Sequence, residues 1–461
     1  MKSSIETSIP ALFNQGFEAH TAGRLQEAEA IYQRVLQQAP RHADAHNLLG
    51  CIFGQTGKLE SAARHLRRSI EIDGSIAEFH CNLGETYRAL GRSHDAVACF
   101  QHALRMKPDM TESHNNLGIA FQDLCRIDEA LHHYRRAVEL KPDYVEARWN
   151  QALCLLLAGR YREGFKEYEW RWQAKSLPPI RELYRDPSWN GEPLKPGGLL
   201  MLHSEQGMGD SLQFARFIPL AAKFGRVMVE VEKPLVPLFR SIPGIEQIIV
   251  KGEPIPRFTR HCPFMSLPRA LGIGLENLPN ATPYLQAPAD QVERWRAEFA
   301  AKPGLKVGLT WRGRPEHRND RHRSMKAEHM AALGGIDGVS FFGIQKDATA
   351  DEIGAIGERG PIQMLSGLDD YGVTAGAVMA LDLVITVDTS VAHLAAALGK
   401  PVWVLIPYSP DWRWLLDRSD SPWYPTMRLF RQHTGGDWAS VVAAVRDRLQ
   451  AVAAEPDRVL P

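Results

Sequence analysis

The segment VITVDTSVAHLAAALGKPVWVLIP, residues 384–407, decides the fold class of the second half of this chain. It begins and ends with apolar runs of strand length, and the stretch between them has the length and composition of a helix. A strand, a helix and a second strand in this order predict a βαβ unit with parallel strands. Ligands bind beyond the carboxyl ends of parallel strands, and Asp388, Thr389 and Ser390 follow the first strand at such an end.

Similar strand-like segments recur after residue 197. They are residues 198–204, 226–232, 246–250, 305–311, 339–345, 381–388 and 401–407. Because helix-sized intervals separate them, we expect an α/β fold with two Rossmann-like lobes, residues 198–303 and 304–461. Residues 176–197 are rich in proline and glycine, and we expect them to form the linker that precedes the lobes.

Residues 1–175, before the linker, contain an internal repeat with a 34-residue step. The positions that keep this step are Ala28, Ala62, Ala96 and Ala130, then Gly23, Gly57, Gly91 and Gly159, with Cys125 in the missing glycine position. Small residues let two helices approach closely, and glycine suits the positive φ of the turn between them. The pattern resembles the tetratricopeptide repeat, in five registers between residues 9 and 172. The resemblance implies an α-helical superhelix with a concave groove that holds a protein or peptide partner.

Three asparagines also keep the repeat step. Asn82, Asn116 and Asn150 fall on the first helix of successive pairs, the face that usually lines the groove. One interpretation is that they hydrogen-bond an extended peptide backbone. The other is that they are solvent-exposed helix residues without a ligand.

The composition of the 461 residues narrows the class of protein. Hydrophobic residues make up 44% and the formal net charge is +0, which argues against a protein that coats nucleic acid. The first twenty residues contain no signal-peptide core, and the apolar runs are too short for a transmembrane segment. Six cysteines without a CxxC pair suggest reduced thiols, so we expect a cytoplasmic protein.

The first polar strand end is HSEQGMGDSLQFARF, residues 203–217. Gly207 and Gly209 let the backbone turn sharply and approach a ligand, and a helix starts near Asp210. Asp210 has two interpretations: it caps this helix, or it acts as a general base.

The second polar strand end is TWRGRPEHRNDRHRSMK, residues 310–326, which follows a strand and carries an excess of arginine. Arginine forks suit phosphate oxygens, so the loop is either an anion site for a diphosphate or a solvated basic loop. A single loop is a small footprint for nucleic acid, which we do not expect as a partner. His317 and His322 could suggest a metal site, but no third ligating residue stands at a matching spacing. We therefore expect no metal site here.

The third polar strand end lies in the segment 384–407 quoted above. The helix after Asp388 presents free backbone N–H groups together with the hydroxyls of Thr389 and Ser390, a typical anion site. His393 lies about one turn further along this helix and faces the same way. It either contacts the ligand or is a buried core histidine. Gln345 stands at the end of another strand. It either contacts the nucleoside of the donor or is a loop residue that contacts no ligand. Trp412, Arg413 and Trp414 either shape a donor pocket or pack between the lobes. Together, the three strand ends indicate a cleft for a phosphorylated donor.

The motifs GDSLQ, VGLTWRG and DTSVAHLAAALGKPVWVL resemble the heptosyltransferase-like glycosyltransferases of the GT-B architecture. YEWRW and EQGMGD resemble, more narrowly, bacterial proteins that join tetratricopeptide repeats to such a domain. The resemblance implies Asp210 as the base. It implies donor contacts from Asp388, Thr389, Ser390 and His393, and from Arg312 and Arg323 where the family has lysine. It also implies that the last helix, about 437–453, crosses back onto the first lobe.

We therefore expect an inverting glycosyltransferase that moves a sugar from a nucleotide-diphosphate donor to an acceptor hydroxyl. The acceptor is a protein or glycan recruited by the repeats. No Asp-x-Asp pair occurs in the chain, so we expect neither a catalytic metal nor a cofactor. The alternative is a non-catalytic interaction scaffold with a degenerate glycosyltransferase-like domain.

Overall fold

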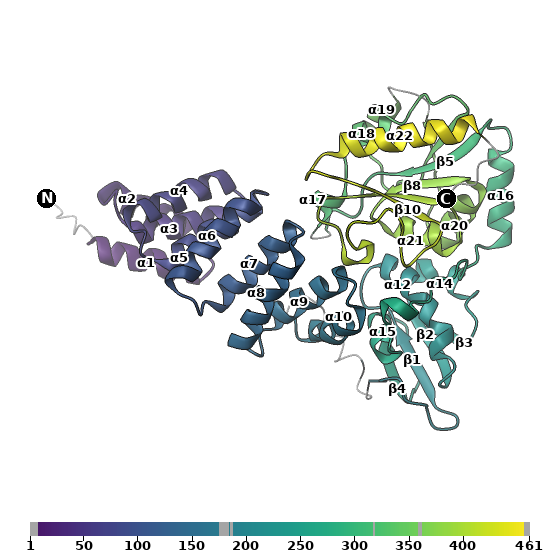
Figure 1. Cartoon of the computed structure of the whole chain (residues 1–461), viewed down its shortest axis with the longest axis horizontal. Helices are drawn as coiled ribbons and strands as arrows, with labels where there is room; N and C mark the ends of the chain where they lie inside the picture. The colour runs from purple at the N-terminus through teal and green to yellow at the C-terminus, as the bar shows by residue number, and fades with distance from the viewer. Residues whose placement is uncertain (1–7, 175–183, 185–187, 317–318, 358–361, 456–461) are drawn as a thin grey trace. The chain divides into compact units, whose positions relative to one another are not determined.

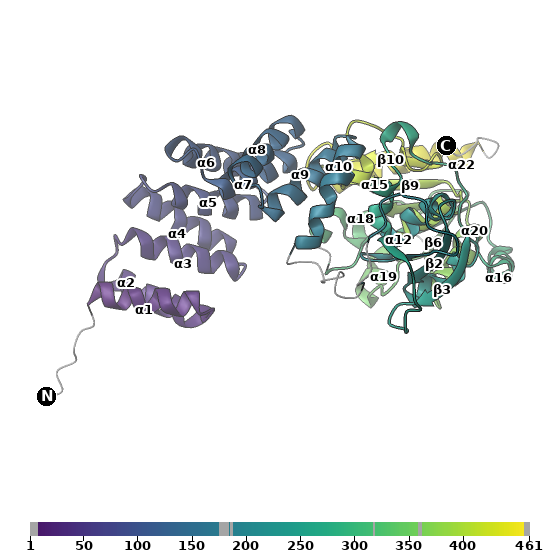
Figure 2. The ribbon, with the colours of Figure 1, turned by 90° about the horizontal axis from the view of Figure 1, so that it is seen from below.

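The computed structural model describes residues 8–174, 184, 188–316, 319–357 and 362–455, and it divides into two compact units (Figures 1 and 2). The first unit is Met1–Cys154 and the second is Leu155–Pro461. Most of the predicted linker, and Arg318 and His317 of the basic loop, lie outside the described residues. Within the described residues, no helix has both the length and the apolar character needed to cross a membrane.

The first unit is a stack of helix pairs. The helices are α1 (Ile9–Thr21), α2 (Leu25–Gln38), α3 (Ala43–Gln55), α4 (Leu59–Ile72), α5 (Ala77–Ala89), α6 (Ser93–Met106), α7 (Thr111–Asp123), α8 (Ile127–Leu140) and α9 (Val145–Leu157). The last of these, α9, runs across the boundary between the two units. Figure 2 shows α1 to α8 side by side as successive antiparallel pairs. The predicted repeat is confirmed, with the four alanines of the repeat each 0% exposed.

Close approach of the paired helices explains the glycines on the first helix of each pair. A Cβ atom added to Gly84 would lie 2.8 Å from Phe100, and one added to Gly118 would lie 2.7 Å from Tyr134. The turn glycines have φ near 75°, and Cys125 adopts φ 57° in the equivalent turn.

The three asparagines that keep the repeat step are hydrogen-bonded to the preceding repeat. Asn82 donates to Asn47 Oδ1 over 2.9 Å, and Asn150 donates to Asn115 Oδ1 over 3.0 Å. Asn116 donates to the carboxylate of Glu85 instead, at 2.6 Å. These amides therefore bond across the repeat junctions, which is a third role beside the two that the sequence analysis weighed.

The last repeat is divided between the units. Its second helix, α10 (Tyr161–Glu167), and the following 3₁₀ helix η1 (Tyr168–Gln173) belong to the second unit, although the repeat pattern was expected to form one array to residue 175. The physical reason is aromatic packing. The Tyr161 ring lies 5.7 Å from Trp423, and the Phe165 ring lies 5.7 Å from Trp412.

The second unit contains two parallel sheets, as predicted. The first has strand order β3-β2-β1-β4, with β1 (Leu199–His203), β2 (Arg226–Val231), β3 (Ile245–Val250) and β4 (Arg260–Pro263). Its α-helices are α12 (Met208–Phe214), α13 (Ile218–Ala221), α14 (Val236–Phe239) and α15 (Leu267–Ala270). The sequence analysis did not identify β4.

The second sheet has strand order β10-β9-β8-β5-β6-β7. Its strands are β5 (Leu305–Thr310), β6 (Val339–Gly343), β7 (Ile362–Met364), β8 (Leu383–Val387), β9 (Val402–Ile406) and β10 (Met427–Arg431). The helices around it are α16 (Ala289–Phe299), α17 (Asp320–Arg323), α18 (Ala327–Ala331), α19 (Ala350–Gly357), α20 (Tyr371–Ala380), α21 (Ser390–Ala397) and α22 (Trp438–Ala454). Helix α16 was expected in the first lobe, but its Phe299 packs against Phe342 of this sheet, with the ring centroids 4.2 Å apart.

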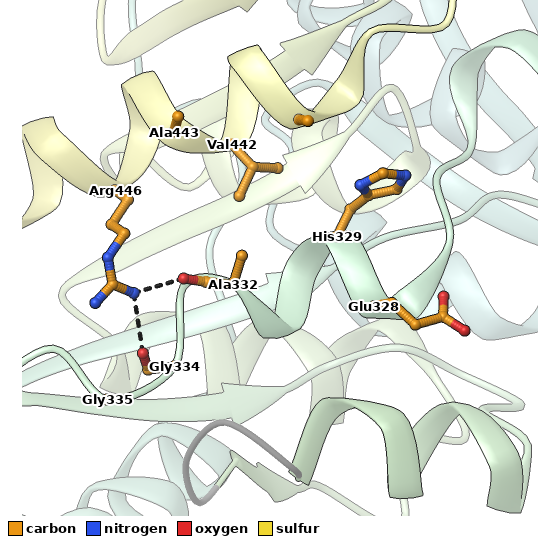
Figure 3. A pocket seen from close by; sticks show the side chains of 9 residues that line it. Glu328, His329, Ala332, Gly334, Gly335, Val442, Ala443 and Arg446 are labelled. Atoms are coloured by element: carbon orange, nitrogen blue, oxygen red, sulfur yellow. Dashed lines mark hydrogen bonds between the residues drawn. The ribbon is translucent and has the colours of Figure 1, made fainter.

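The final helix also packs on the second sheet, which corrects the expectation that it crosses back to the first lobe. The apolar face of α22, with Val445 and Leu449, lies in one core with Val307 and Leu383 of this sheet. Figure 3 shows the contact with the segment after α18, where Arg446 donates to the Gly334 carbonyl over 3.0 Å. The large apolar side chains of α22 are therefore already buried against this sheet, which keeps the helix on the second lobe.

Candidate functional site

A cavity of about 790 Å³ lies in the second unit, bordered by loops that follow strands of both sheets. All the residues predicted for the site line it: Gly207, Gly209, Asp210, Arg312, Arg323, Gln345, Asp388, Thr389, Ser390 and His393. These residues converge because each follows the carboxyl end of a parallel strand, where ligands bind in such sheets. The prediction of the site rested on the same rule.

Asp210 lies in the first turn of α12 and performs the capping role. Its Oδ2 accepts the backbone N–H of Gly207 over 2.9 Å, while its Oδ1 accepts a hydrogen bond from the guanidinium of Arg413. The side chain is partly exposed to the cavity, with 22% of its surface accessible. Gly209 allows this helix start to approach α21, because a Cβ atom there would lie 3.2 Å from the His393 ring.

The loop before Asp210 is held by a buried ion pair that the sequence analysis did not identify. Arg171 of η1 is fully buried and donates to both carboxylate oxygens of Glu205, over 2.9 and 2.8 Å. It also donates to Ser266 and to Glu169. Next in the chain, Gln206 donates to the Tyr168 hydroxyl over 2.9 Å. The last repeat segment therefore forms part of the support of the glycine loop.

Arg413 joins the two lobes at the cavity. Its Nε donates to Gln213 Oε1 over 2.6 Å, and its Nη1 donates to Asp411 over 2.8 Å, in addition to the bond to Asp210. Burial alone would lower the pKa of Arg413, but the carboxylates of Asp411 and Asp210 outweigh it and keep the pKa above its usual range. Arg413 is thus a permanent cation between two carboxylates, and not only a packing residue.

Asp388 follows β8 and lies beside the same cluster. Burial raises its pKa to about 6, the charge of Asp411 adds to this shift, and Arg323 opposes it. The backbone carbonyl of Asp388 accepts from Arg323 Nη1 over 3.0 Å, so the arginine binds the strand end and not the acid itself.

The raised pKa of Asp388 gives a stability prediction. In the folded chain its pKa lies above the ordinary value of 3.8, so its contribution to stability is complete below pH 3.8 and is lost as the pH rises through about 6. Replacement Asp388→Asn is therefore expected to raise the free energy of unfolding of the second unit by about 3 kcal/mol at neutral pH. Urea unfolding of both proteins across this pH range measures it. A difference that does not change with pH would contradict the prediction.

The N-terminus of α21 carries the remaining predicted residues. The hydroxyls of Thr389 and Thr386 lie 3.1 Å apart, and Ser390 accepts from the Tyr371 hydroxyl over 2.7 Å. His393 is buried, with Nδ1 3.0 Å from the Tyr424 hydroxyl. Burial, followed by nearby arginines, holds the pKa of His393 well below its usual range, so the ring is neutral at pH 7.

The arginines of the loop after β5 differ in their partners. Arg312 is bound to Glu352, with Nε 2.7 Å from Oε1, so its charge is already balanced. The pKa of Glu352 is lowered to about 2: burial would raise it, but the hydrogen bond from Arg312 and further donors outweigh that effect. Arg314 also lines the cavity and has no hydrogen bond or ion pair with another described residue. Arg314 belongs to the basic loop 310–326 that the sequence analysis identified, but it was not among the residues selected for the site.

Gln345 has a structural role that neither interpretation anticipated. Its side-chain oxygen accepts the backbone N–H groups of Trp311, over 3.2 Å, and Arg312, over 3.1 Å. It therefore fixes the start of the arginine loop. Among the residues that the structure describes, no three or more His, Cys, Asp or Glu side chains form a group able to hold a metal ion.

Comparison with known proteins identifies the first part of the chain. Residues 9–75, 75–143 and 116–174 match family models of the tetratricopeptide repeat. Protein FlbA of Caulobacter vibrioides is 29% identical over 335 residues, 66% of this chain, and the chain spans 55% of the length of that relative.

Two solved structures have a similar repeat region. MamA is 21% identical with a TM-score of 0.32, over 34% of this chain and 92% of its own. YrrB, a TPR protein with an unusual peptide-binding site, is 16% identical with a TM-score of 0.32, over 37% of this chain and 87% of its own. Residues 9–174 of this chain, which the family models match, are a tetratricopeptide repeat region.

Proposed function

We propose that the second unit is a GT-B glycosyltransferase that transfers a sugar, with inversion and without a metal ion, from a nucleotide-diphosphate donor to an acceptor hydroxyl. The observation that carries the proposal is one cavity with a carboxylate at a helix start beside one sheet and a second helix start, with hydroxyls and arginines, beside the other. The compartment that we propose is the cytoplasm.

The donor side of the cavity suits a diphosphate. The N-terminus of α21 offers backbone N–H groups and the hydroxyls of Thr389 and Ser390. Arg314 adds a cation that forms no ion pair with another described residue. As the bond from the anomeric carbon to the diphosphate oxygen breaks, its electron pair passes to that oxygen, and these donors stabilise the charge.

The acceptor side centres on Asp210. The acceptor hydroxyl oxygen forms the new bond to the anomeric carbon from the face opposite the leaving group, and its proton passes to the Asp210 carboxylate. Arg413 and the Gly207 N–H group fix the orientation of this carboxylate through its two oxygens. The repeats, as interaction modules, recruit the protein or glycan that carries the hydroxyl.

Thermal-shift measurements with UDP, GDP, ADP, CMP and dTDP test the proposal. We expect one nucleoside diphosphate to raise the unfolding midpoint of the second unit selectively, because a ligand that binds only the folded state stabilises it. A folded protein whose midpoint none of the five changes would argue against a donor site.

Replacement Arg314→Gln is expected to weaken the selected nucleoside diphosphate by about 10- to 100-fold, the effect of losing a hydrogen bond to a charged group. Isothermal titration calorimetry measures this loss. The matched control is Arg226→Gln, because Arg226 pairs with Glu246 on an exposed surface outside the cavity lining. Equal affinities of the two variants would remove Arg314 from the site.

A non-catalytic scaffold is the second candidate. The observation that favours it is the tetratricopeptide repeat match itself, since such repeats bind partners without chemistry. This candidate predicts partner binding by the repeats together with no turnover of any nucleotide sugar.

A further inference from the structure

Two repeats of the first unit contain the same pair of histidines. His46 on α3 faces His65 on α4, and His114 on α7 faces His133 on α8. The Nδ1 atoms of the two rings lie 3.0 Å apart in each pair. The second pair stands two repeat lengths after the first, so one arrangement occurs twice in the array.

The backbone fixes the tautomer of one ring in each pair. His46 Nε2 lies 3.2 Å from the Pro40 carbonyl oxygen, and His114 Nε2 lies 3.0 Å from that of Pro108. A carbonyl oxygen only accepts, so Nε2 carries the hydrogen and the Nδ1 lone pair points at the partner ring. Metal-bound histidines typically have this arrangement, with the second ring nitrogen donating to a carbonyl.

The spacing of the nitrogens suits a chelate. With metal–nitrogen bonds of about 2.0–2.1 Å, two nitrogens bound at a right angle lie about 2.9 Å apart. Phenylalanines hold the partner rings, with Phe53 5.4 Å from His65 and Phe121 5.6 Å from His133 between ring centroids. The same spacing also suits a hydrogen bond between two neutral rings, in which a proton takes the place of the metal.

We propose that each pair, His46 with His65 and His114 with His133, chelates a divalent first-row transition-metal ion through the two Nδ1 atoms. No group of three or more ligating side chains forms among the described residues, so water completes the coordination. Each ion links the two helices of one repeat, and imidazole ligands suit zinc, copper and nickel.

Isothermal titration calorimetry with NiCl₂ and ZnCl₂, on the full chain without an affinity tag, tests the proposal. We expect two sites in the unmodified protein, one in His65→Gln, one in His133→Gln and none in the double variant. The matched control is His102→Gln, because His102 contacts His80 in the intervening repeat with the ring centroids 4.3 Å apart. This control is expected to keep both sites.

Circular dichroism of each variant, with the helical signal intact, shows that a lost site is not a lost fold. Absence of saturable binding at millimolar metal concentration in the unmodified protein would mean that the pairs share only a proton, and this would overturn the proposal. Two sites in the double variant would overturn it as well, since the ions would then bind elsewhere.

Discussion

Replacement Arg171→Ala is expected to lower the free energy of unfolding of the second unit by about 3–5 kcal/mol, the usual cost of removing one partner of a buried ion pair. Arg171 has no exposed side-chain surface, and its partner Glu205 is 1% exposed. Without the guanidinium, the Glu205 carboxylate would keep only the Met265 N–H group, at 3.1 Å, as a hydrogen-bond donor among the residues that the structure describes. Urea unfolding followed by tryptophan fluorescence measures the change, because ten of the eleven tryptophans follow residue 154.

Two variants serve as controls for Arg171. Arg226→Ala removes an exposed arginine from a pair with Glu246 and is expected to leave the unfolding midpoint unchanged. Arg171→Lys keeps the charge but cannot bind both carboxylate oxygens in a planar fork, so its stability should lie between those of the alanine variant and the unmodified protein. An alanine variant as stable as the control would show that the ion pair does not hold the loop.

The repeats and most of the strands were predictable because each is encoded by a local period. Ala28 and its equivalents recur at every 34th residue, and the strand segments alternate with intervals of helix length. The boundary between the units was not predictable in this way. Residues 161–173 continue the repeat pattern, yet Tyr161 bonds to Trp423, far along the chain, which no local period reveals.

The candidate site shows the same limit. Its lining residues were predictable because polar residues after parallel strands converge at one edge of the sheets. Their partners were not. Arg413 reaches Asp210 across 203 positions, and Arg312 is balanced by Glu352 across 40 positions. The loop after β5 therefore carries less unpaired positive charge in the structure than its sequence suggests. For this reason Arg314 is a better candidate for a ligand contact than Arg312.

Replacement Asp210→Asn is expected to lower turnover by about 10²- to 10⁴-fold, the usual contribution of a general base. The amide oxygen still accepts the Gly207 N–H group, and Arg413 keeps its bond to Asp411, so the fold should persist. Affinity for the nucleoside diphosphate should also persist, because Asp210 faces the acceptor in the proposed reaction. Release of the nucleoside diphosphate from its sugar donor, together with calorimetric affinity, separates the two effects.

The informative comparison for Asp210 is Asp411→Asn, which removes the other carboxylate bound by Arg413. If Asp210 acts as the base, its variant loses turnover at unchanged affinity, whereas Asp411→Asn retains most of it. If Asp210 only neutralises Arg413 and caps α12, the two variants should behave alike, since each leaves the buried arginine with one carboxylate. Equal turnover in both variants would therefore reject Asp210 as the base. Because Asp388 has a raised pKa and lines the same cavity, it would be the next carboxylate to test.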